Sequence, residues 1–352
     1  MKHLIDLDDF SLNEINSIIN KAIEIKNNQH KFLDVMHGKI IGTLFYEPST
    51  RTQMSFQTAM LKLGGQVIGF NNPQNSSIAK GENFKDTIKV IGGYADIIAI
   101  RHPLEGAAKA ASLFSDCPII NAGDGSHLHP TQTLTDLLTI SEQKNTLSGL
   151  NLGFCGDLKY GRTVHSLVKM MLKYENNKFI FISTKELQIP KYIKNMIIAS
   201  GNYYEELFSL EDAIEKLDIL YMTRIQRERF KSIQDYNMQK NVFKLTTDKL
   251  ERASPNMIIL HPLPRVDEID IAVDNDPRAL YFKQASNGVF VRMALILHIL
   301  SAKNTEAVER INLNECCTNK LCITNHEKYL PHYFKKNKND YFCEYCSREI
   351  KL

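Results

Sequence analysis

The chain lacks three features that would assign it to a class at once. Its 43 Lys and Arg nearly balance its 40 Asp and Glu, so the formal net charge of +3 is too small to indicate wholesale nucleic-acid binding. The longest apolar runs, such as residues 293–300, are far too short to cross a bilayer. The N-terminus carries acidic side chains where a signal peptide needs an apolar stretch. We expect a cytoplasmic protein with no nucleic-acid partner and no membrane, in which any anion site is local.

The length and the order of the apolar segments predict an α/β fold with more than one domain. A chain of 352 residues exceeds what one hydrophobic core usually serves. Four short β-branched or aromatic runs lie between residues 39 and 123, and four more between residues 150 and 264. These runs alternate with longer helical patterns, which is typical of parallel sheets covered on both faces. The fold class is therefore α/β, with two parallel-sheet domains and a small C-terminal module.

Domain boundaries follow from the same pattern. We expect a first domain at residues 1–135, a second at 136–287 and a small module at 310–352, where the composition changes to Cys, Asn, Lys and Tyr. A helical pattern from Thr131 to Glu142 joins the two large domains. An apolar helix is expected from Val289 to Leu300, and the segment 288–303 that contains it is expected to pack back on the first domain.

The first strand ends in a turn that suits a phosphate. Glu47 and Pro48 break the strand, and helical spacing resumes within residues 54–64, so Ser49, Thr50, Arg51 and Thr52 fall at a strand-to-helix turn. Helix N-termini offer unpaired N–H groups and a partial positive charge, and an arginine adds a two-pronged contact to phosphate oxygens. The plain alternative is that a hydroxyl only caps the helix, which would leave the arginine unexplained.

Two further strand ends carry hydrogen-bond donors. Arg101 ends the strand at residues 96–101, and His129 and Gln132 follow the strand at residues 118–123. Ligands of open α/β sheets bind beyond the carboxyl ends of the strands. A single arginine in such a place is more often a surface ion-pair partner, but three strand ends with donors favour one shared crevice.

In this order, the segments STRT at 49–52, RHP at 101–103 and HPTQ at 129–132 resemble the carbamoyl phosphate-binding signature of the transcarbamoylases. Four other segments resemble the aspartate-specific members of that family: KGE at 80–82, GDLKYGRTVHSL at 156–167, TRIQRERF at 223–230 and HPLPRVDEI at 261–269. Ornithine-specific members are expected to show a cysteine-containing motif in place of the last one. The resemblance covers about residues 3–303.

The resemblance implies a reaction and a fold of two parallel-sheet domains. The α-amine of L-aspartate would attack the carbonyl carbon of carbamoyl phosphate, giving N-carbamoyl-L-aspartate and phosphate, an early step of de novo pyrimidine biosynthesis. No side chain needs to form a covalent bond, and no catalytic cofactor is implied, because positioning of the two substrates can supply much of the acceleration.

The resemblance also implies the residues that bind carbamoyl phosphate. The phosphate ligands would be Ser49, Thr50, Arg51 and Thr52. The donors to the carbonyl oxygen would be Thr52, Arg101 and His129. The groups around the carbamoyl amine would be Gln132 and carbonyls near Pro262 and Leu263. Loss of one donor to a developing oxyanion typically costs roughly 2.7–4 kcal/mol of transition-state stabilisation.

On the aspartate side, Arg162 and Arg224, with Gln226, would bind the two carboxylates, for which bidentate guanidinium groups are well suited. Ser76 and Lys80 lie in a polar loop that in the family enters the active site of the neighbouring subunit. The resemblance therefore implies a homotrimer with shared sites, in which Lys80 takes part in catalysis. Composition alone would favour a solvated lysine on a surface loop.

Four C-terminal cysteines have the spacing of a zinc site. Cys317 and Cys322 form a C-x4-C pair, and Cys343 and Cys346 form a C-x2-C pair about twenty residues later. Two such pairs can make a tetrahedral structural zinc site, one per chain, with Cys316 as a possible competitor for Cys317. The tail resembles the zinc domain of the regulatory chain found with aspartate-specific transcarbamoylases. That resemblance implies a fusion, and larger assemblies formed through the zinc module.

Two other functions agree with parts of this sequence but are disfavoured. A carbamoyltransferase acting on ornithine or another amine is disfavoured by HPLPRVDEI and by the pair of Arg162 and Arg224. A binding protein with an inactive α/β body and a zinc module on nucleic acid is disfavoured because every expected catalytic position is filled. The basic run of the tail, Lys335, Lys336 and Lys338, is also short.

Overall fold

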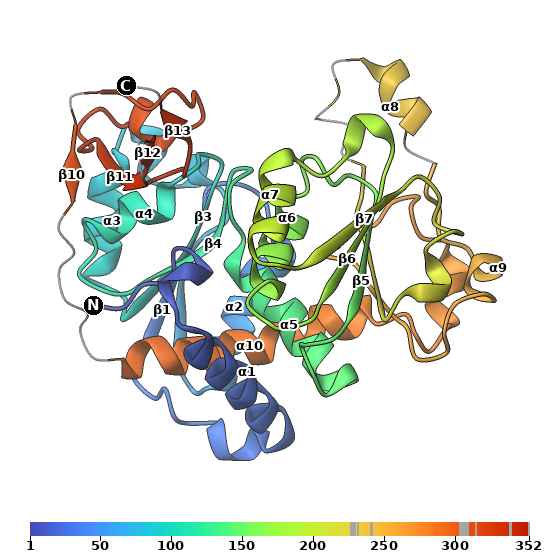
Figure 1. Cartoon of the computed structure of the whole chain (residues 1–352). Helices are drawn as coiled ribbons and strands as arrows, with labels where there is room; N and C mark the ends of the chain where they lie inside the picture. Colours follow the sequence, from blue (N-terminus) through green and yellow to red (C-terminus); the bar gives the residue numbers. More distant parts are fainter. Residues whose placement is uncertain are drawn as a thin grey trace. The chain divides into compact units, whose positions relative to one another are not determined.

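The computed structural model describes residues 1–225, 230, 232–239, 242–302, 310–313, 315–337 and 340–350. The chain divides into two compact units (Figure 1). Unit 1 comprises Met1–Thr131 and Val289–Leu352, and unit 2 comprises Gln132–Gly288. Within the described residues, no helix is long and apolar enough to cross a membrane.

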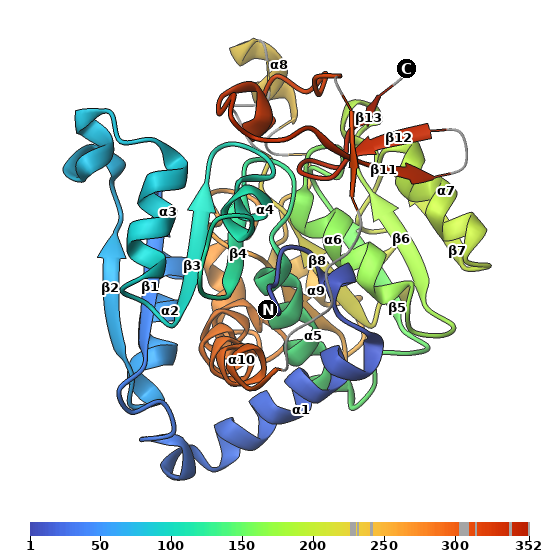
Figure 2. The ribbon, with the colours of Figure 1, turned by 90° about the vertical axis from the view of Figure 1, so that its left-hand side faces the viewer.

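Unit 1 is built on a four-stranded parallel sheet, and Figure 2 shows its strands side by side in the order β2-β1-β3-β4. Its strands are β1 (Ile40–Phe45), β2 (Gln66–Phe70), β3 (Ile97–His102) and β4 (Ile119–Asp124). Its first helices are α1 (Leu12–Asn27), α2 (Thr50–Lys62), α3 (Phe84–Gly92) and α4 (Ala107–Ser112). Strands β1, β3 and β4 are almost wholly buried, as their continuous apolar runs predict.

Unit 2 holds a second parallel sheet, in the order β7-β6-β5-β8-β9. Its strands are β5 (Asn151–Cys155), β6 (Lys178–Ile182), β7 (Tyr203–Leu207), β8 (Ile219–Met222) and β9 (Ile258–Leu260). Its own helices are α6 (Arg162–Met171), α7 (Lys191–Ala199), α8 (Ile233–Gln239) and α9 (Thr247–Leu250). The prediction of two parallel-sheet α/β domains is confirmed.

The second sheet has five strands, whereas the sequence pattern predicts four. Strand β7 lies at the sheet edge and reads YYEEL, with two glutamates and no apolar run. Edge strands often carry charged side chains, so the apolar pattern does not reveal them. Strand β7 was therefore missed.

The two long helices agree with the sequence pattern over most of their length. Helix α5 (Pro130–Lys144) includes the predicted segment. Helix α10 (Tyr281–Ser301) begins eight residues before the expected Val289. Its first turns are polar. Gln284 and Asn287 are buried there and donate hydrogen bonds to side chains of α5, so their burial leaves no apolar periodicity in the sequence. A search for apolar spacing therefore places the start too late.

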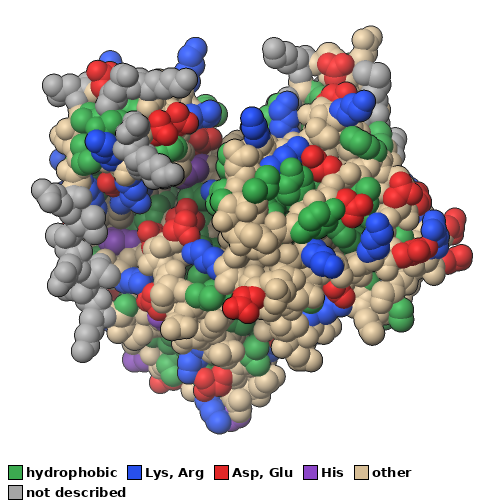
Figure 3. Space-filling view, viewed as in Figure 1, with side chains coloured by type: hydrophobic (Ala, Val, Ile, Leu, Met, Phe, Trp, Pro, Cys, Tyr) green, Lys and Arg blue, Asp and Glu red, His purple; other side chains and the backbone are tan. Residues whose placement is uncertain are grey.

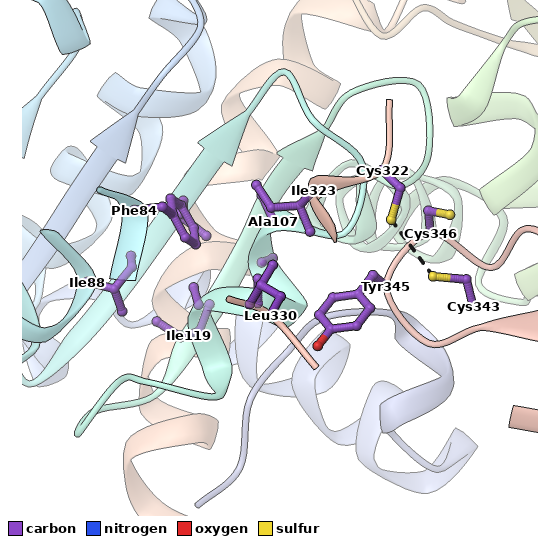
Figure 4. Close-up of a cluster of buried hydrophobic side chains, with 14 of the residues drawn as sticks. Phe84, Ile88, Ala107, Ile119, Cys322, Ile323, Leu330, Cys343, Tyr345 and Cys346 are labelled. Atoms are coloured by element: carbon purple, nitrogen blue, oxygen red, sulfur yellow. Dashed lines mark hydrogen bonds between the residues drawn. The ribbon is translucent and has the colours of Figure 1, made fainter. Parts of the chain in front are cut away.

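The C-terminal module is a small antiparallel sheet in the order β10-β11-β12-β13. Its strands are β10 (Ile311–Asn312), β11 (Tyr333–Asn337), β12 (Asp340–Cys343) and β13 (Glu349–Ile350). The alanines of α4 belong to a buried cluster that also contains Ile323, Leu330 and Tyr345 of the module. Figure 4 shows these three side chains pointing into that cluster. The module thus shares its core with the rest of unit 1.

Backbone contacts also join the module to the N-terminal part of unit 1. The Glu105 N–H donates to the Leu321 carbonyl at 2.9 Å, and the Ile323 N–H donates to the Glu105 carbonyl at 3.0 Å. The Asn319 amide donates to the buried Glu105 carboxylate at 2.6 Å. A Cβ on Gly106 would lie 2.4 Å from the Tyr345 Cβ, so the close approach requires glycine.

Candidate active site

The turn between β1 and α2 presents the predicted phosphate ligands. Ser49 occupies the N-cap position of α2, yet its side chain makes no capping hydrogen bond. Thr50 and Arg51 are exposed, and Thr52 is buried in the first turn. The structure thus does not support capping by Ser49 as the reason for this sequence. The first N–H groups of a thirteen-residue helix and the side chains beside them form an arrangement suited to a phosphate.

Arg101 lies at the carboxyl end of β3 with most of its side chain buried. Its Nη2 pairs with Glu47 Oε1 at 2.8 Å, and its Nη1 donates to the Ala122 carbonyl at 3.3 Å. Its Nε is buried without a hydrogen-bond partner in the part of the chain that the structure describes. Burial lowers the pKa of Arg101, and the Glu47 carboxylate counters part of that effect. An arginine ordinarily stays charged in proteins, so it can donate to an oxygen that gains negative charge.

Gly123 brings Arg101 and His129 together. Its φ is +122°, and a Cβ there would lie 2.7 Å from Arg101 Nη1 and 3.7 Å from His129 Cδ2. Arg101 and His129 therefore meet around one residue at the end of β4. Strand β3 neighbours β1 in the sheet, and Tyr46, just before the turn between β1 and α2, donates its N–H to the Arg101 carbonyl at 2.8 Å. Three predicted strand ends thus converge in unit 1.

The loop before His129 is organised by the buried carboxylate of Asp124. It accepts hydrogen bonds from Gly106 N at 2.7 Å and from Leu128 N at 3.0 Å. His127 contacts it at 3.1 Å. Burial alone would lower the pKa of His127, but the Asp124 carboxylate outweighs that effect and raises it. The loop that carries His129 is therefore held by several fixed contacts.

Gly123→Ala is expected to lower kcat by about 10²-fold, because a displacement of about 1 Å in a substrate-positioning group costs that much. The new methyl group must displace Arg101, and alanine is also strained at this φ. The measurement is steady-state kinetics beside thermal unfolding. Gly149→Ala is a matched control, since Gly149 also has a positive φ but nothing lies within 4 Å of its Cβ position. Equal kcat for the two variants would contradict the prediction.

Ser76 and Lys80 lie on an exposed segment of unit 1. Ser76 donates to the Pro73 carbonyl at 2.6 Å and accepts from Ile78 N at 3.3 Å, which shapes the turn. Lys80 is exposed at the end of a short 3-10 helix, just before Gly81 with φ +94°. Its ammonium group is open to a partner from outside the chain.

The predicted aspartate ligands lie at neighbouring strand ends of unit 2. Arg162 opens α6 after β5, and Arg224 follows β8, the strand next to β5. The two ends are tied together, because the Thr223 hydroxyl donates to the Cys155 carbonyl at 3.0 Å. A Cβ on Gly156 would lie 2.5 Å from the Thr223 carbonyl oxygen. Both arginines are half-buried, while Gln226 lies outside the described residues.

Gln132 and the loop after β9 also belong to unit 2. Gln132 donates its side-chain amide to Asp136 Oδ1 at 2.8 Å. Pro262 and Leu263 directly follow His261, whose Nδ1 accepts from Leu263 N at 2.8 Å. Asp136 was missed by sequence reasoning, although a Gln and an Asp four residues apart on a helix are known to pair.

The four predicted zinc ligands are gathered in the C-terminal module. The sulfur atoms of Cys317, Cys322, Cys343 and Cys346 all lie within 4.8 Å of one another, and all four side chains are buried. The sulfur atoms of Cys317 and Cys346 are 3.5 Å apart. Those of Cys322 and Cys343, which a dashed line joins in Figure 4, are 3.8 Å apart. Tetrahedral zinc with bonds of about 2.3 Å places its sulfurs roughly 3.8 Å apart. The four thiols therefore fit a zinc ion. Cys316 is exposed and outside this cluster.

The surface charge is mixed on the face shown in Figure 3, where basic and acidic side chains are interspersed. Among the predicted basic residues of the tail, Lys335 and Lys336 are exposed on β11, and Lys338 lies outside the described residues. On this face, binding of an anion therefore depends on local groups rather than on a field of one sign.

Comparison with known proteins identifies similar chains for most of the length. Residues 2–142 match the model of the aspartate/ornithine carbamoyltransferase carbamoyl-P binding domain, and residues 148–299 match that of the Asp/Orn binding domain. An aspartate carbamoyltransferase catalytic subunit of Clostridium perfringens is 57% identical over 300 residues, covering 85% of this chain and 98% of the relative. One from Clostridium botulinum is 56% identical over 303 residues, covering 86% and 99%.

Solved structures agree with these relatives. The catalytic subunit of M. jannaschii aspartate transcarbamoylase aligns with a TM-score of 0.80 at 50% identity, covering 85% of this chain and 98% of that one. Aspartate transcarbamoylase from Trypanosoma cruzi, solved in complex with carbamoyl phosphate and aspartate, aligns with a TM-score of 0.80 at 35% identity, covering 85% and 97%. The family models end at residue 299, so the four-cysteine module lies beyond the part they match.

Proposed function

The chain belongs to the aspartate/ornithine carbamoyltransferase family and catalyses transfer of a carbamoyl group to L-aspartate, and from this premise we propose how its own residues carry out the reaction. The aspartate amine attacks the carbonyl carbon of carbamoyl phosphate, the bond from that carbon to the phosphate oxygen breaks, and N-carbamoyl-L-aspartate and phosphate leave. The convergence of Arg101 and His129 around Gly123 carries the proposal.

The carbamoyl phosphate residues of unit 1 have separate roles. We assign the phosphate to the first turn of α2, with ligands Ser49, Thr50, Arg51 and Thr52. Thr52, Arg101 and His129 donate to the carbonyl oxygen as it becomes negative in the tetrahedral intermediate. The ion pair between Arg101 and Glu47 holds the guanidinium at the strand end, and the Arg101 Nε is a buried donor that a substrate oxygen can satisfy.

The acceptor residues of unit 2 bind the two carboxylates of aspartate. Arg162 and Arg224 stand at the ends of adjacent strands, which suits a substrate with two anionic groups. Gln226 is assigned beside them from its motif. The carbonyls of Pro262 and Leu263 and the side-chain oxygen of Gln132 accept hydrogen bonds from the carbamoyl amine. Ornithine would bring a second ammonium group to this pair of cations, which disfavours it.

A homotrimer with shared active sites is proposed for the assembly. Lys80 is exposed on its segment, and Ser76 shapes the turn before it, so both can enter a neighbouring subunit's site. Lys80 would add positive charge at the carbamoyl phosphate of that neighbour. Light scattering of the purified protein should then give a molar mass of three chains or a multiple of three, and a monomer that remains active would contradict the sharing of sites.

The C-terminal module is proposed to hold one structural zinc ion per chain. Cys317, Cys322, Cys343 and Cys346 would bind it as thiolates, and the ion would fix the module's loops. The contacts of Glu105 with Asn319, Leu321 and Ile323 support a role in stabilising unit 1. Linkage of subunits through the exposed side of the module, without nucleotide sensing, is the second part of this proposal. A large effect of CTP or ATP on the purified chain would contradict it.

The test of the reaction is a product assay on the purified chain with carbamoyl phosphate, offering L-aspartate and L-ornithine in parallel. We expect carbamoyl aspartate from aspartate and no citrulline from ornithine. Arg51→Ala should abolish most of the activity, because the phosphate loses its bidentate ligand. Citrulline as the main product would overturn the acceptor assignment and keep the phosphate assignment.

A further inference from the structure

Asp136 is a buried carboxylate in unit 2 whose described hydrogen bonds all come from uncharged donors. Its exposure is 0%. Gln132 Nε2 and Gln284 Nε2 donate to its Oδ1 at 2.8 and 2.6 Å, and the Tyr221 hydroxyl donates to its Oδ2 at 3.0 Å. Burial raises the pKa of Asp136 to about 7, although these three donors lower it in part. Burying a carboxyl group in this way is costly, which points to a role beyond packing.

The carboxyl group decides how the Gln132 amide is oriented. A glutamine can present either its oxygen or its NH2 group to a neighbour. Oδ1 of Asp136 accepts from two amides, so a proton on the carboxyl group would sit on Oδ2, facing the Tyr221 hydroxyl. In both protonation states Oδ1 stays an acceptor. Gln132 must therefore turn its NH2 group toward Asp136, which leaves its Oε1 available as an acceptor.

The same oxygen also fixes the loop after β9. Gln284 donates to Asp136 Oδ1 and accepts, through its own Oε1, from the backbone N–H of His261 at 2.9 Å. His261 in turn holds Leu263 N on its Nδ1 and donates from its Nε2 to Glu268 at 2.7 Å. One buried atom thus connects Gln132 with the segment that carries the carbonyls of Pro262 and Leu263.

We propose that Asp136 is a positioning residue that makes the carbamoyl-amine subsite a set of acceptors only. The proposal rests on the proposed function, because it uses the assignment of Gln132, Pro262 and Leu263 to the amine. A subsite with acceptors alone fits the two N–H groups of a carbamoyl group. It selects against the acetyl group, in which a methyl group replaces NH2, because the acceptors are then left unpaired. Asp136 thereby sets the preference for carbamoyl phosphate over acetyl phosphate.

The experiment compares three ligands on full-length protein by titration calorimetry: carbamoyl phosphate, acetyl phosphate and inorganic phosphate. Asp136→Leu keeps the volume and removes the acceptor, so affinity for carbamoyl phosphate should fall roughly 10- to 100-fold. Affinity for acetyl phosphate and for inorganic phosphate should stay within about twofold, since neither uses the acceptors. Equal weakening of all three ligands would mean that Asp136 only supports the fold.

Asp136→Asn provides the rescue. Its side-chain oxygen can still accept from Gln132 and Gln284, so it should keep the wild-type preference, whereas loss of the preference in both variants would overturn the acceptor argument. Tyr221→Phe is the matched control, because it removes a donor to Asp136 without touching either glutamine. If Asp136→Leu does not fold, Gln284→Leu tests the same chain of contacts and should lose part of the preference. An unchanged preference in that variant would overturn the link to the loop.

The two proposals fail in distinguishable ways. If the wild-type chain binds carbamoyl phosphate but makes no carbamoyl aspartate, the assigned reaction fails while the ligand preference can still be measured. If the wild-type chain is active and Asp136→Leu keeps its preference, only the role of Asp136 is refuted.

Discussion

Arg101→Ala is expected to lower kcat by 10²–10³-fold with the protein still folded, the size of effect seen when one oxyanion donor is removed, about 2.7–4 kcal/mol. The guanidinium lies where β3 ends, beside His129, and its Nε has no hydrogen-bond partner among the described residues. In the proposed mechanism this guanidinium donates to the carbonyl oxygen as that oxygen gains negative charge. Steady-state kinetics with saturating aspartate, together with thermal unfolding, measures the effect.

Arg278→Ala is the matched control for this variant. Arg278 is buried to a similar degree, with 16% of its side chain exposed against 12% for Arg101, and it also pairs with a carboxylate, that of Asp276. It stands in unit 2 on a contact with no assigned role in substrate binding. We expect it to lose stability and keep kcat. A loss below tenfold in Arg101→Ala, or an equal loss in Arg278→Ala, would refute the assignment of Arg101.

The sequence predicted the fold to the extent that apolar runs report burial. The eight expected strands are all present, because β1, β3, β4 and the central strands of unit 2 are buried on both faces. The charged edge strand β7 and the polar first turns of α10 lacked that signal. In the module, the cysteine spacing predicted the four-cysteine cluster, but nothing in its short apolar segments showed that Tyr345 and Leu330 complete a core on α4.

For the site, motifs predicted which residues stand at strand ends, and topology then places Arg101 beside His129 and Arg162 near Arg224. The residues that hold these groups were not predicted. Asp136 and Gln284 are 148 residues apart in the chain, and their contact depends on the packing of two helices. Single-sequence patterns report local structure, so a long-range buried hydrogen bond leaves no periodic trace. The sequence predicted the hydroxyls after β1 as phosphate ligands or caps, and only the structure shows that the Ser49 side chain makes no capping hydrogen bond.

Removal of the proposed zinc ion is expected to destabilise the rest of unit 1 as well as the module. The module's Ile323, Leu330 and Tyr345 complete a core that includes the alanines of α4, so unfolding of the module exposes apolar surface of the catalytic body. Several kcal/mol of lost burial would lower the midpoint of thermal unfolding by roughly 5–15 °C, at roughly 2–4 °C per kcal/mol for a unit of this size. Scanning calorimetry before and after dialysis against a chelator, with zinc added back, measures the shift.

Cys343→Ser should reproduce the chelated state, because a structural zinc site with one thiolate missing holds its ion far more weakly. Metal analysis should fall from one zinc ion per chain toward zero. Cys316→Ser is the matched control, since Cys316 is exposed, adjacent to Cys317 in sequence and outside the cluster. It should keep both the zinc and the wild-type unfolding midpoint. If Cys316→Ser loses the zinc while Cys343→Ser retains it, the ligand set is wrong. If the chelated protein unfolds at the wild-type temperature, the module does not support unit 1, and the shared core at α4 contributes little to its stability.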